Sequence, residues 1–225
     1  SGDDRQGPCP LEQKDVTEEE HNSRQEAIFD EHADFFASED ASPPQVLERL
    51  RRIAVTCQVT PETTILDVAT GTGGLLPHFE DRGANLRLVT GVDLSGGMLD
   101  YARKRFPSAT FVKSDIMKYR PVAGARFDRV VFNACFGNFW DQGLVLKHTE
   151  AELVRDGGLI VISHPLGRKW LGDLKARDPQ MVRHALPTRV ELEALASRCA
   201  PGLAVELCDD EADYYCAALR CRQQP

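Results

Sequence analysis

From residue 64 onward, short apolar runs alternate with stretches of helical spacing. The runs predict strands over Thr64–Val68, Arg87–Val92, Thr110–Lys113, Arg129–Phe132 and Leu159–Ile162. The intervening stretches predict helices over Gly74–Arg82, Gly97–Phe106 and Gly143–Val154. Strands that are apolar throughout and alternate with helices indicate a parallel sheet covered on both faces.

Two further apolar runs, Leu203–Leu207 and Tyr214–Leu219, follow a helix that opens with a capping box at Thr188 and Glu191. Only an acidic segment, 209–213, joins the two runs. It is too short for the crossover that a parallel pair needs, so they are predicted to form a hairpin. The expected fold class is α/β, a doubly wound and mostly parallel sheet of seven strands with an antiparallel last strand.

The 225 residues are enough for one domain of this kind. Residues 1–16 are polar and carry two prolines, so we expect a disordered tail there and a single domain over residues 17–225. The domain opens with two predicted helices, one starting at a capping box of Thr17 and Glu20 and one near Pro43.

The composition argues against some partners. The formal charge is −8, which disfavours nucleic acid, and no run approaches the roughly 20 apolar residues of a membrane helix. Seven cysteines at irregular spacing, without a C-x-x-C pair, favour free thiols over disulfides or structural zinc. The chain begins Ser-Gly, which suggests a cloning remnant or a removed leader. We expect a soluble intracellular protein, in the cytoplasm or, after loss of a leader, inside an organelle.

The first predicted strand leads into a glycine-rich turn, Ala69-Thr70-Gly71-Thr72-Gly73-Gly74, and then a helix. Glycine lets backbone approach a ligand closely, and the helix start offers unpaired N–H groups to an anionic part of it. A dinucleotide fingerprint would need a third glycine at position 76, which is leucine. The turn therefore predicts a nucleotide-like ligand other than a nicotinamide or flavin dinucleotide.

Residues 67–73 resemble the first motif of the class I S-adenosylmethionine (SAM) dependent methyltransferases, an acidic residue followed by x-G-x-G-x-G. Alanine stands at the first glycine position, as is common in the small-molecule branch that includes quinone and sterol methyltransferases. The resemblance spans roughly residues 22–221. It implies SAM as cofactor, S-adenosylhomocysteine as product and an N-terminal helical lid over residues 17–57. The cofactor contacts implied here are Asp67, Ala69, Thr70, Gly71 and Gly73.

Two more motifs follow in the order that the resemblance requires. Asp93 ends the second predicted strand, where a carboxylate can accept both ribose hydroxyls, and Leu94 and Met98 would flank the adenine. After the third strand come Ser114, Asp115 and Ile116. By resemblance, the Asp115 carboxylate and the Ile116 N–H would bind the adenine edge.

The fourth strand ends in Asn133-Ala134-Cys135-Phe136, followed by Phe139 and Trp140. By resemblance Asn133 would contact the cofactor, and the three aromatic residues would wall the substrate pocket, although packing in the core would explain them equally well. The tip lacks the two prolines of the Asn-Pro-Pro-aromatic motif that marks the branch methylating amino groups and nucleobases. Cys135 is either reactive or an inert buried thiol, and burial is the more ordinary role.

His164 follows the fifth strand, at the sheet edge where ligands bind, so it is the first candidate for a general base. His32, on the expected lid, is the second. The other histidines (His21, His78, His148 and His184) are expected on the surface, and none is spaced for a metal site. Residues 164–187 are predicted to form a long irregular substrate lid, where Arg168, Lys169, Arg177 and Arg183 suggest an acidic acceptor.

The predicted function is methyl transfer from SAM to a small molecule, without nucleic-acid partners, stable membrane insertion or a metal. Two alternatives stay open. One is a decarboxylated-SAM aminopropyltransferase, for which Asp141 would be the polyamine-binding carboxylate. The other is a non-catalytic scaffold subunit with the same fold. The sequence leaves open the acceptor, its accepting atom, the need for a base and the oligomeric state.

Overall fold

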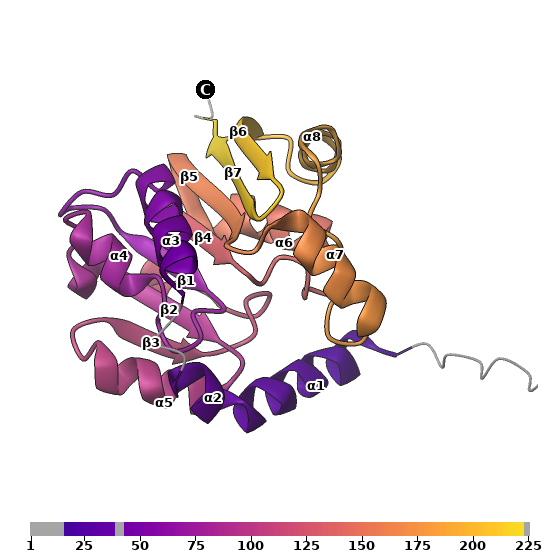
Figure 1. Cartoon of the computed structure of the whole chain (residues 1–225). Coiled ribbons are helices and arrows are strands. Elements are labelled where there is room, and N and C mark those ends of the chain that lie inside the picture. Colours follow the sequence, from indigo (N-terminus) through magenta and orange to yellow (C-terminus); the bar gives the residue numbers. More distant parts are fainter. Residues whose placement is uncertain (1–15, 39–42, 223–225) are drawn as a thin grey trace, which may run out of the picture.

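The computed structural model describes residues 16–38 and 43–222. A seven-stranded sheet in the order β3-β2-β1-β4-β5-β7-β6 forms its centre (Figure 1). Five strands are parallel: β1 (Ile65–Val68), β2 (Val89–Asp93), β3 (Thr110–Lys113), β4 (Phe127–Asn133) and β5 (Val154–His164). The hairpin of β6 (Leu203–Glu211) and β7 (Tyr214–Cys221) completes the sheet, with β7 antiparallel to both neighbours. The predicted fold class is confirmed.

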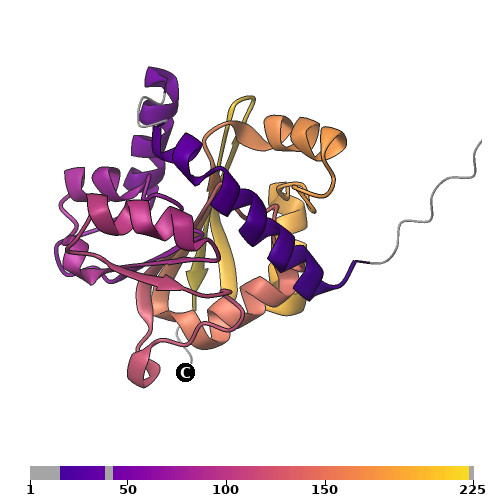
Figure 2. The same ribbon diagram turned by 90° about the horizontal axis from the view of Figure 1, so that it is seen from below.

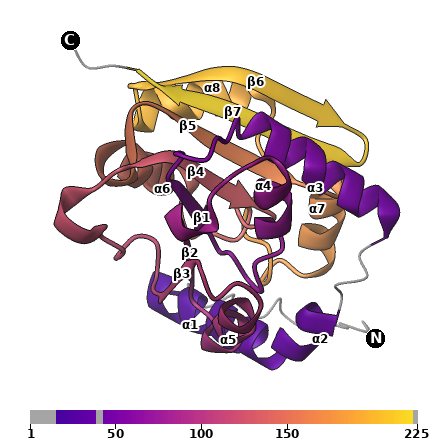
Figure 3. The same cartoon turned by 90° about the vertical axis from the view of Figure 1, so that its left-hand side faces the viewer.

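Helices cover both faces of the sheet, because successive residues of the buried strands point to opposite sides. On one face Ile65 and Val131 pack against α3 (Pro44–Thr56) and α4 (Leu76–Asp81) (Figure 3). On the other, Leu66 and Phe132 pack with α6 (Gln142–His148) and α8 (Arg189–Cys199). The remaining helices are α1 (Glu18–Glu31), α2 (Ala33–Ser38), α5 (Gly96–Arg105) and α7 (Gly167–Arg177), with a π-helical turn over Thr149–Leu153 and 3₁₀ turns over Leu86–Leu88 and Val122–Gly124.

Several predicted boundaries were wrong. The helix predicted over Gly143–Val154 ends as an α-helix at His148 and continues as a π-helical turn. β5 begins five residues before the predicted Leu159, because an irregularity in its pairing with β4 carries the strand through 155–158. The irregular lid predicted over 164–187 contains α7, whose Leu171 and Leu174, at helical spacing, pack on the core. The predicted tail, apart from Val16, lies outside the described residues.

Helix α1, part of the predicted lid, crosses the carboxyl edge of the parallel strands (Figure 2). Asp30 Oδ1 accepts hydrogen bonds from the Ser95 hydroxyl (2.5 Å) and the Gly97 N–H (3.0 Å) at the start of α5. At the other end of α1, His21 Nε2 is bonded to the Asn138 carbonyl (2.6 Å). These bonds hold the helix over the ends of β2 and β4.

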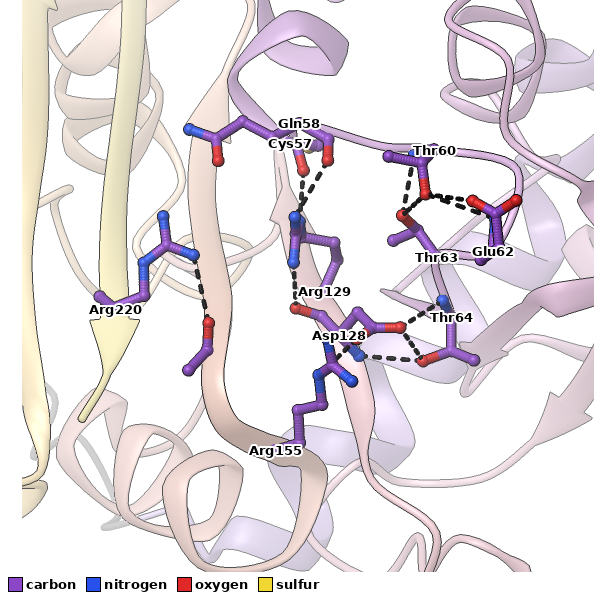
Figure 4. Close-up of polar contacts among 11 residues, drawn as sticks. Cys57, Gln58, Thr60, Glu62, Thr63, Thr64, Asp128, Arg129, Arg155 and Arg220 are labelled. Atoms are coloured by element: carbon purple, nitrogen blue, oxygen red, sulfur yellow. Dashed lines mark hydrogen bonds and ion pairs between the residues drawn. The ribbon is translucent and has the colours of Figure 1, made fainter. Parts of the chain in front are cut away.

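A polar network around Asp128 and Arg129 lies at the opposite edge of the sheet, where β1 and β4 begin (Figure 4). Asp128 Oδ2 accepts from the Thr64 N–H and hydroxyl, both at 2.8 Å, and its other oxygen pairs with Arg155. Arg129 donates to the carbonyls of Cys57 and Gln58. Burial by itself would raise the pKa of Asp128, but the bonds from Thr64 and the charges of Arg155 and Arg129 hold it below its usual value.

We expect Asp128→Ala to lower the free energy of unfolding by about 2 kcal/mol, because it removes a buried carboxylate and leaves the partly buried Thr64 N–H and hydroxyl without their partner. Urea unfolding at pH 7 measures this. Asp156→Ala, on the same edge but exposed, is the control and should change stability by less than about 0.5 kcal/mol. Equal effects of the two substitutions would contradict the structural role of Asp128. Because the pKa of Asp128 is lowered, its contribution is present at neutral pH and lost as the carboxyl protonates in acid.

Candidate functional site

A cavity of about 530 Å³ opens at the carboxyl ends of β1, β2 and β4, under α1. Most of the predicted cofactor residues line it: Asp67, Ala69, Thr70, Gly71, Asp93, Leu94, Met98, Asp115, Ile116 and Asn133. These residues come from four strand ends that are far apart in the sequence and meet because the strands are parallel. Gly73 and Ser114 do not line the cavity.

The glycine turn is joined to the second motif by a direct bond. The Gly71 N–H donates to Asp93 Oδ2 (2.8 Å), and the Ser95 N–H donates to Oδ1 (2.9 Å). Gly71 has φ +56°, and a Cβ built there would meet no atom within 4 Å, so the backbone is open to the cavity. Gly73, with φ +84°, plays a packing role, because a Cβ there would lie 2.8 Å from the Phe106 ring.

Asp67 is the most deeply buried acid of the cavity. It is 2% exposed, and its Oδ2 accepts a hydrogen bond from the Thr70 hydroxyl (2.6 Å). Burial, opposed by that bond and reinforced by the nearby Asp93, raises its pKa to about 7. Burial also raises the pKa of Asp93, against the bonds that it accepts from backbone N–H groups.

Three carboxyl groups and one guanidinium, that of Arg105, are among the described lining residues. Arg105 donates to the carbonyl of Thr72 within the glycine turn (3.1 Å). This excess of acidic groups favours a ligand that carries positive charge. Arg105 adds a cation on the side of the glycine turn.

Asp115 contacts helix α1 at the cavity wall. Asp115 Oδ1 accepts from the Met117 N–H (2.9 Å), and Oδ2 accepts from the side-chain amide of Asn22 on α1 (3.1 Å). Gln25 and Asn138, bonded to each other at 3.3 Å, also line the cavity. Asn22, Gln25 and Asn138 were not predicted, because their place at the site depends on how α1 packs rather than on a local motif.

The predicted aromatic wall is only partly at the cavity. Phe139 lines it, whereas Phe136 is fully buried against the rings of Phe132 and Phe139. Trp140 lies outside the lining, and the central carbon of the Arg183 guanidinium is 3.5 Å from the centre of its ring. Cys135 lines the cavity, but burial raises the pKa of its thiol well above the usual value, so the inert role fits it.

The structure places neither candidate base in the cavity lining. His164 is 4% exposed, packs on Trp170 and accepts the Leu166 N–H at Nδ1 (3.2 Å), and burial lowers its pKa to about 4. His32 is exposed and bonded to the Ile28 carbonyl of its own helix. These contacts give both histidines roles in local structure.

The expectation that the four other histidines lie on the surface was wrong. His21, His78 and His148 are 6–8% exposed, and His184 is partly buried and bonded to the Trp140 carbonyl. The polar ring of histidine gives no sequence signal of burial, because packing by other elements decides it. Of the four, only His78 lines the cavity.

Three further properties concern possible metal ligands, membrane-spanning helices and cysteines. Within residues 16–38 and 43–222, no group of three or more His, Cys, Asp or Glu is arranged to hold a metal ion. None of the helices in those ranges combines the length and apolar character needed to cross a membrane. The six cysteines found there are free thiols.

Comparison with known proteins identifies a domain in the middle of the chain. Residues 65–158, which carry all three motifs, match a family described as a methyltransferase domain. The demethylmenaquinone methyltransferase of Thermotoga maritima is 32% identical over 114 residues, which cover 51% of this chain and 48% of that protein. Residues 65–158 of the chain therefore form a methyltransferase domain. The chain spans about half the length of the curated relatives that it matches.

Another sequence relative and a solved structure are also methyltransferases. An N,N-dimethyltransferase of Streptomyces venezuelae that acts on dTDP-3-amino-3,4,6-trideoxy-alpha-D-glucopyranose is 35% identical over 113 residues, covering 46% of this chain and 43% of that protein. The 1,6-didemethyltoxoflavin-N1-methyltransferase of Burkholderia thailandensis, solved with S-adenosylhomocysteine, superposes with a TM-score of 0.68 at 16% identity, covering 96% of this chain and 94% of that one. The second likeness shows that the methyltransferase architecture extends beyond residues 65–158 to nearly the whole chain.

Proposed function

We propose that this protein is a methyltransferase that binds SAM in the cavity and transfers the methyl group to a neutral, largely apolar small molecule. The observation that carries the proposal is the bond between the Gly71 N–H and Asp93, which joins the glycine turn and the ribose-binding carboxylate at one wall of the cavity. It is supported by relatives with different acceptors that share the region containing these motifs.

The residues at this wall fit the parts of SAM. Each Asp93 oxygen has a second lone pair beyond the one used by the backbone, so the carboxylate can also accept ribose hydroxyls. Asp115, which already accepts an amide N–H from Asn22, is suited to accept the adenine amino group. Asp67 and the other cavity acids favour the cationic end of the cofactor, and Arg105 suits its carboxylate.

Bound SAM supplies a methyl group on a positively charged sulfur, open to in-line attack by a nucleophile. The chain contributes position rather than covalent chemistry: the strand ends fix the cofactor, and α1, latched at Asp30 and His21, covers the site. Alignment of two reactants can supply about 7–11 kcal/mol of rate acceleration. An inert thiol at Cys135 and the positions of His164 and His32 outside the lining are compatible with this mode.

The acceptor class follows from the rest of the lining. Away from the acidic wall the cavity is bounded by apolar side chains from α1 to α4 and the β4 loop: Phe29, Phe36, Leu47, Leu50, Leu75, Pro77 and Phe139. The cations that suggested an acidic acceptor lie elsewhere. Arg168 pairs with Asp210 and Lys169 with Asp173, and neither lines the cavity. A charged acceptor would lose its hydration against this apolar wall, so a neutral one is favoured.

Calorimetric titration of SAM into the protein tests the proposal, and absence of binding at millimolar SAM would overturn it. We expect Asp93→Ala to weaken binding at least tenfold, about 1.4 kcal/mol. Asp100→Ala, an exposed carboxylate on α5, is the matched control and should leave the affinity within twofold. Equal affinities of the two variants would contradict the role of Asp93.

The aminopropyltransferase alternative receives less support. Asp141, its proposed polyamine-binding carboxylate, caps α6 by accepting the Leu144 N–H (2.9 Å) and does not line the cavity. Arg105 beside the glycine turn also suits the carboxylate that decarboxylated SAM lacks. Preference for decarboxylated SAM over SAM in the same titration would reverse this choice.

A further inference from the structure

Helix α1 reaches the cavity through Asn22, which lies outside the matched domain of residues 65–158. The side-chain amide of Asn22 donates a hydrogen bond to Asp115 Oδ2 (3.1 Å), and both residues line the cavity. Asp115 follows the end of β3, 93 positions further along the chain. The packing of α1 therefore places a donor directly on the carboxylate that we assign to the adenine.

The Asp115 carboxylate is held from two sides. Its Oδ1 accepts the Met117 N–H (2.9 Å) of its own loop, and its Oδ2 accepts the amide of Asn22. A carboxylate held at only one oxygen can turn, because its terminal torsion has no sharp minimum. Each oxygen keeps a second lone pair that a ligand can use. The bond from Asn22 therefore fixes the direction in which Asp115 presents its free lone pair.

Other contacts keep α1 in place without this bond. Further side chains of the helix bond to α5, to β3 and to the segment after α7. They are Asp30, bonded to Ser95 (2.5 Å), Glu26, paired with Lys113 (2.7 Å), and Gln25, bonded to the Met181 carbonyl (3.0 Å). Removal of the Asn22 amide should therefore leave the helix docked and change mainly the support of Asp115.

We propose that Asn22 is a positioning residue that orients Asp115 toward the 6-amino group of the cofactor, so that helix α1 helps to select adenine over a 6-oxo base. This inference rests on the proposed function. An ionised carboxylate only accepts hydrogen bonds, whereas a 6-amino group donates them and a 6-oxo group accepts them. A carboxylate fixed by Asn22 therefore favours adenine and repels the 6-oxo group.

Loss of the Asn22 donor should weaken this selection for a geometric reason. In a 6-oxo base the donor is the neighbouring ring N1–H instead of the exocyclic group. A carboxylate that is free to turn can move from the exocyclic position toward this N1–H, whereas one held at both oxygens cannot follow it. A freely turning Asp115 therefore distinguishes the two bases less.

Calorimetric titration of S-adenosylhomocysteine and of its 6-oxo analogue, S-inosylhomocysteine, tests this role. We expect the wild type to prefer S-adenosylhomocysteine at least thirtyfold, because the analogue leaves Asp115 facing an acceptor. Asn22→Leu, which has a similar size but no donor, should reduce this preference at least fivefold. Asn22→Gln, which retains an amide donor, should keep it within threefold of the wild type.

Glu26→Gln is the matched control, because Glu26 lies on the same helix and pairs with Lys113 but does not line the cavity. It should keep the wild-type preference within twofold. The preference compares two ligands on one preparation, so a partly unfolded variant still reports it.

Three results would overturn the inference. They are an equal loss of affinity for both ligands in Asn22→Leu, an equal loss of preference in Asn22→Leu and Asn22→Gln, and a wild type that binds both ligands equally well. The first of these would mean that Asn22 only holds the helix. Failure of the wild type to bind SAM would instead overturn the proposed function, so the two failures are distinguishable.

Discussion

Replacing Gly71 by valine is expected to lower the affinity for SAM at least hundredfold. Gly71 has φ +56°, which a β-branched residue adopts only with strain, and its missing Cβ faces open cavity rather than protein. The valine side chain would occupy the space beside Asp93 that we assign to the cofactor. The Gly71 N–H would also move relative to the Asp93 oxygen that it now contacts.

Gly83→Val separates the steric effect on the ligand from backbone strain. Gly83 has φ +91° and the same open surroundings, but it lies after α4 and does not line the cavity. Both variants should lose about 1–3 kcal/mol of stability in urea unfolding, because both put a β-branched residue at positive φ. Only Gly71→Val should lose SAM binding in calorimetry. Unchanged binding in Gly71→Val would contradict the placement of the cofactor at the glycine turn. Loss of binding in both variants would mean that backbone strain, rather than a side chain in the space of the ligand, causes the loss.

The affinity for SAM should rise about tenfold between pH 6 and pH 8. The pKa of Asp67 is raised to about 7 by burial, so the carboxyl is mostly protonated at pH 6 and mostly charged at pH 8. A positively charged ligand binds the charged form better, and binding should therefore release a proton. Asp67→Asn, which cannot change its charge, should flatten the pH profile. An equally steep profile in that variant would place the titrating group elsewhere.

The same raised pKa predicts the opposite trend for the stability of the protein without ligand. The folded state holds the Asp67 proton more tightly than the unfolded chain, so this residue lowers stability as pH rises from about 4 to about 7. A rise of about three pKa units corresponds to about 4 kcal/mol at most. Comparing urea unfolding of the wild type and Asp67→Asn across this range isolates the effect, since the other carboxyl groups titrate in both proteins.

The sheet and the acidic wall of the cavity could be predicted because their signals are local. Apolar runs mark β1 to β5, and Gly71, Asp93 and Asp115 stand directly at strand ends. Parallel strands bring their carboxyl ends to one edge, so residues in those positions meet without further information. The hairpin of β6 and β7 was predictable for a similar reason, because the short acidic segment 209–213 leaves no room for a crossover, although the structure extends β6 to Glu211.

The acceptor side of the cavity could not be predicted in the same way. His164 has the expected place in the sequence, yet Trp170 and the Leu166 N–H cover it, and Phe136 is enclosed by its aromatic neighbours. Conversely, the sequence predicted His78 on the surface, whereas the structure shows it 7% exposed on α4, a helix that packs against α3. Burial of a polar ring depends on elements that are distant in the sequence, which no local pattern records.

By itself, then, the amino-acid sequence determined the order of strands and helices along the chain and the motif residues that meet at the cavity, because spacing and strand ends set both. Only the tertiary structure decided which other side chains line the cavity and which polar rings are buried. The physical reason is that hydrogen-bond satisfaction and desolvation are properties of packed neighbours, and in this protein α1, α3 and α4 supply those neighbours from outside the motifs.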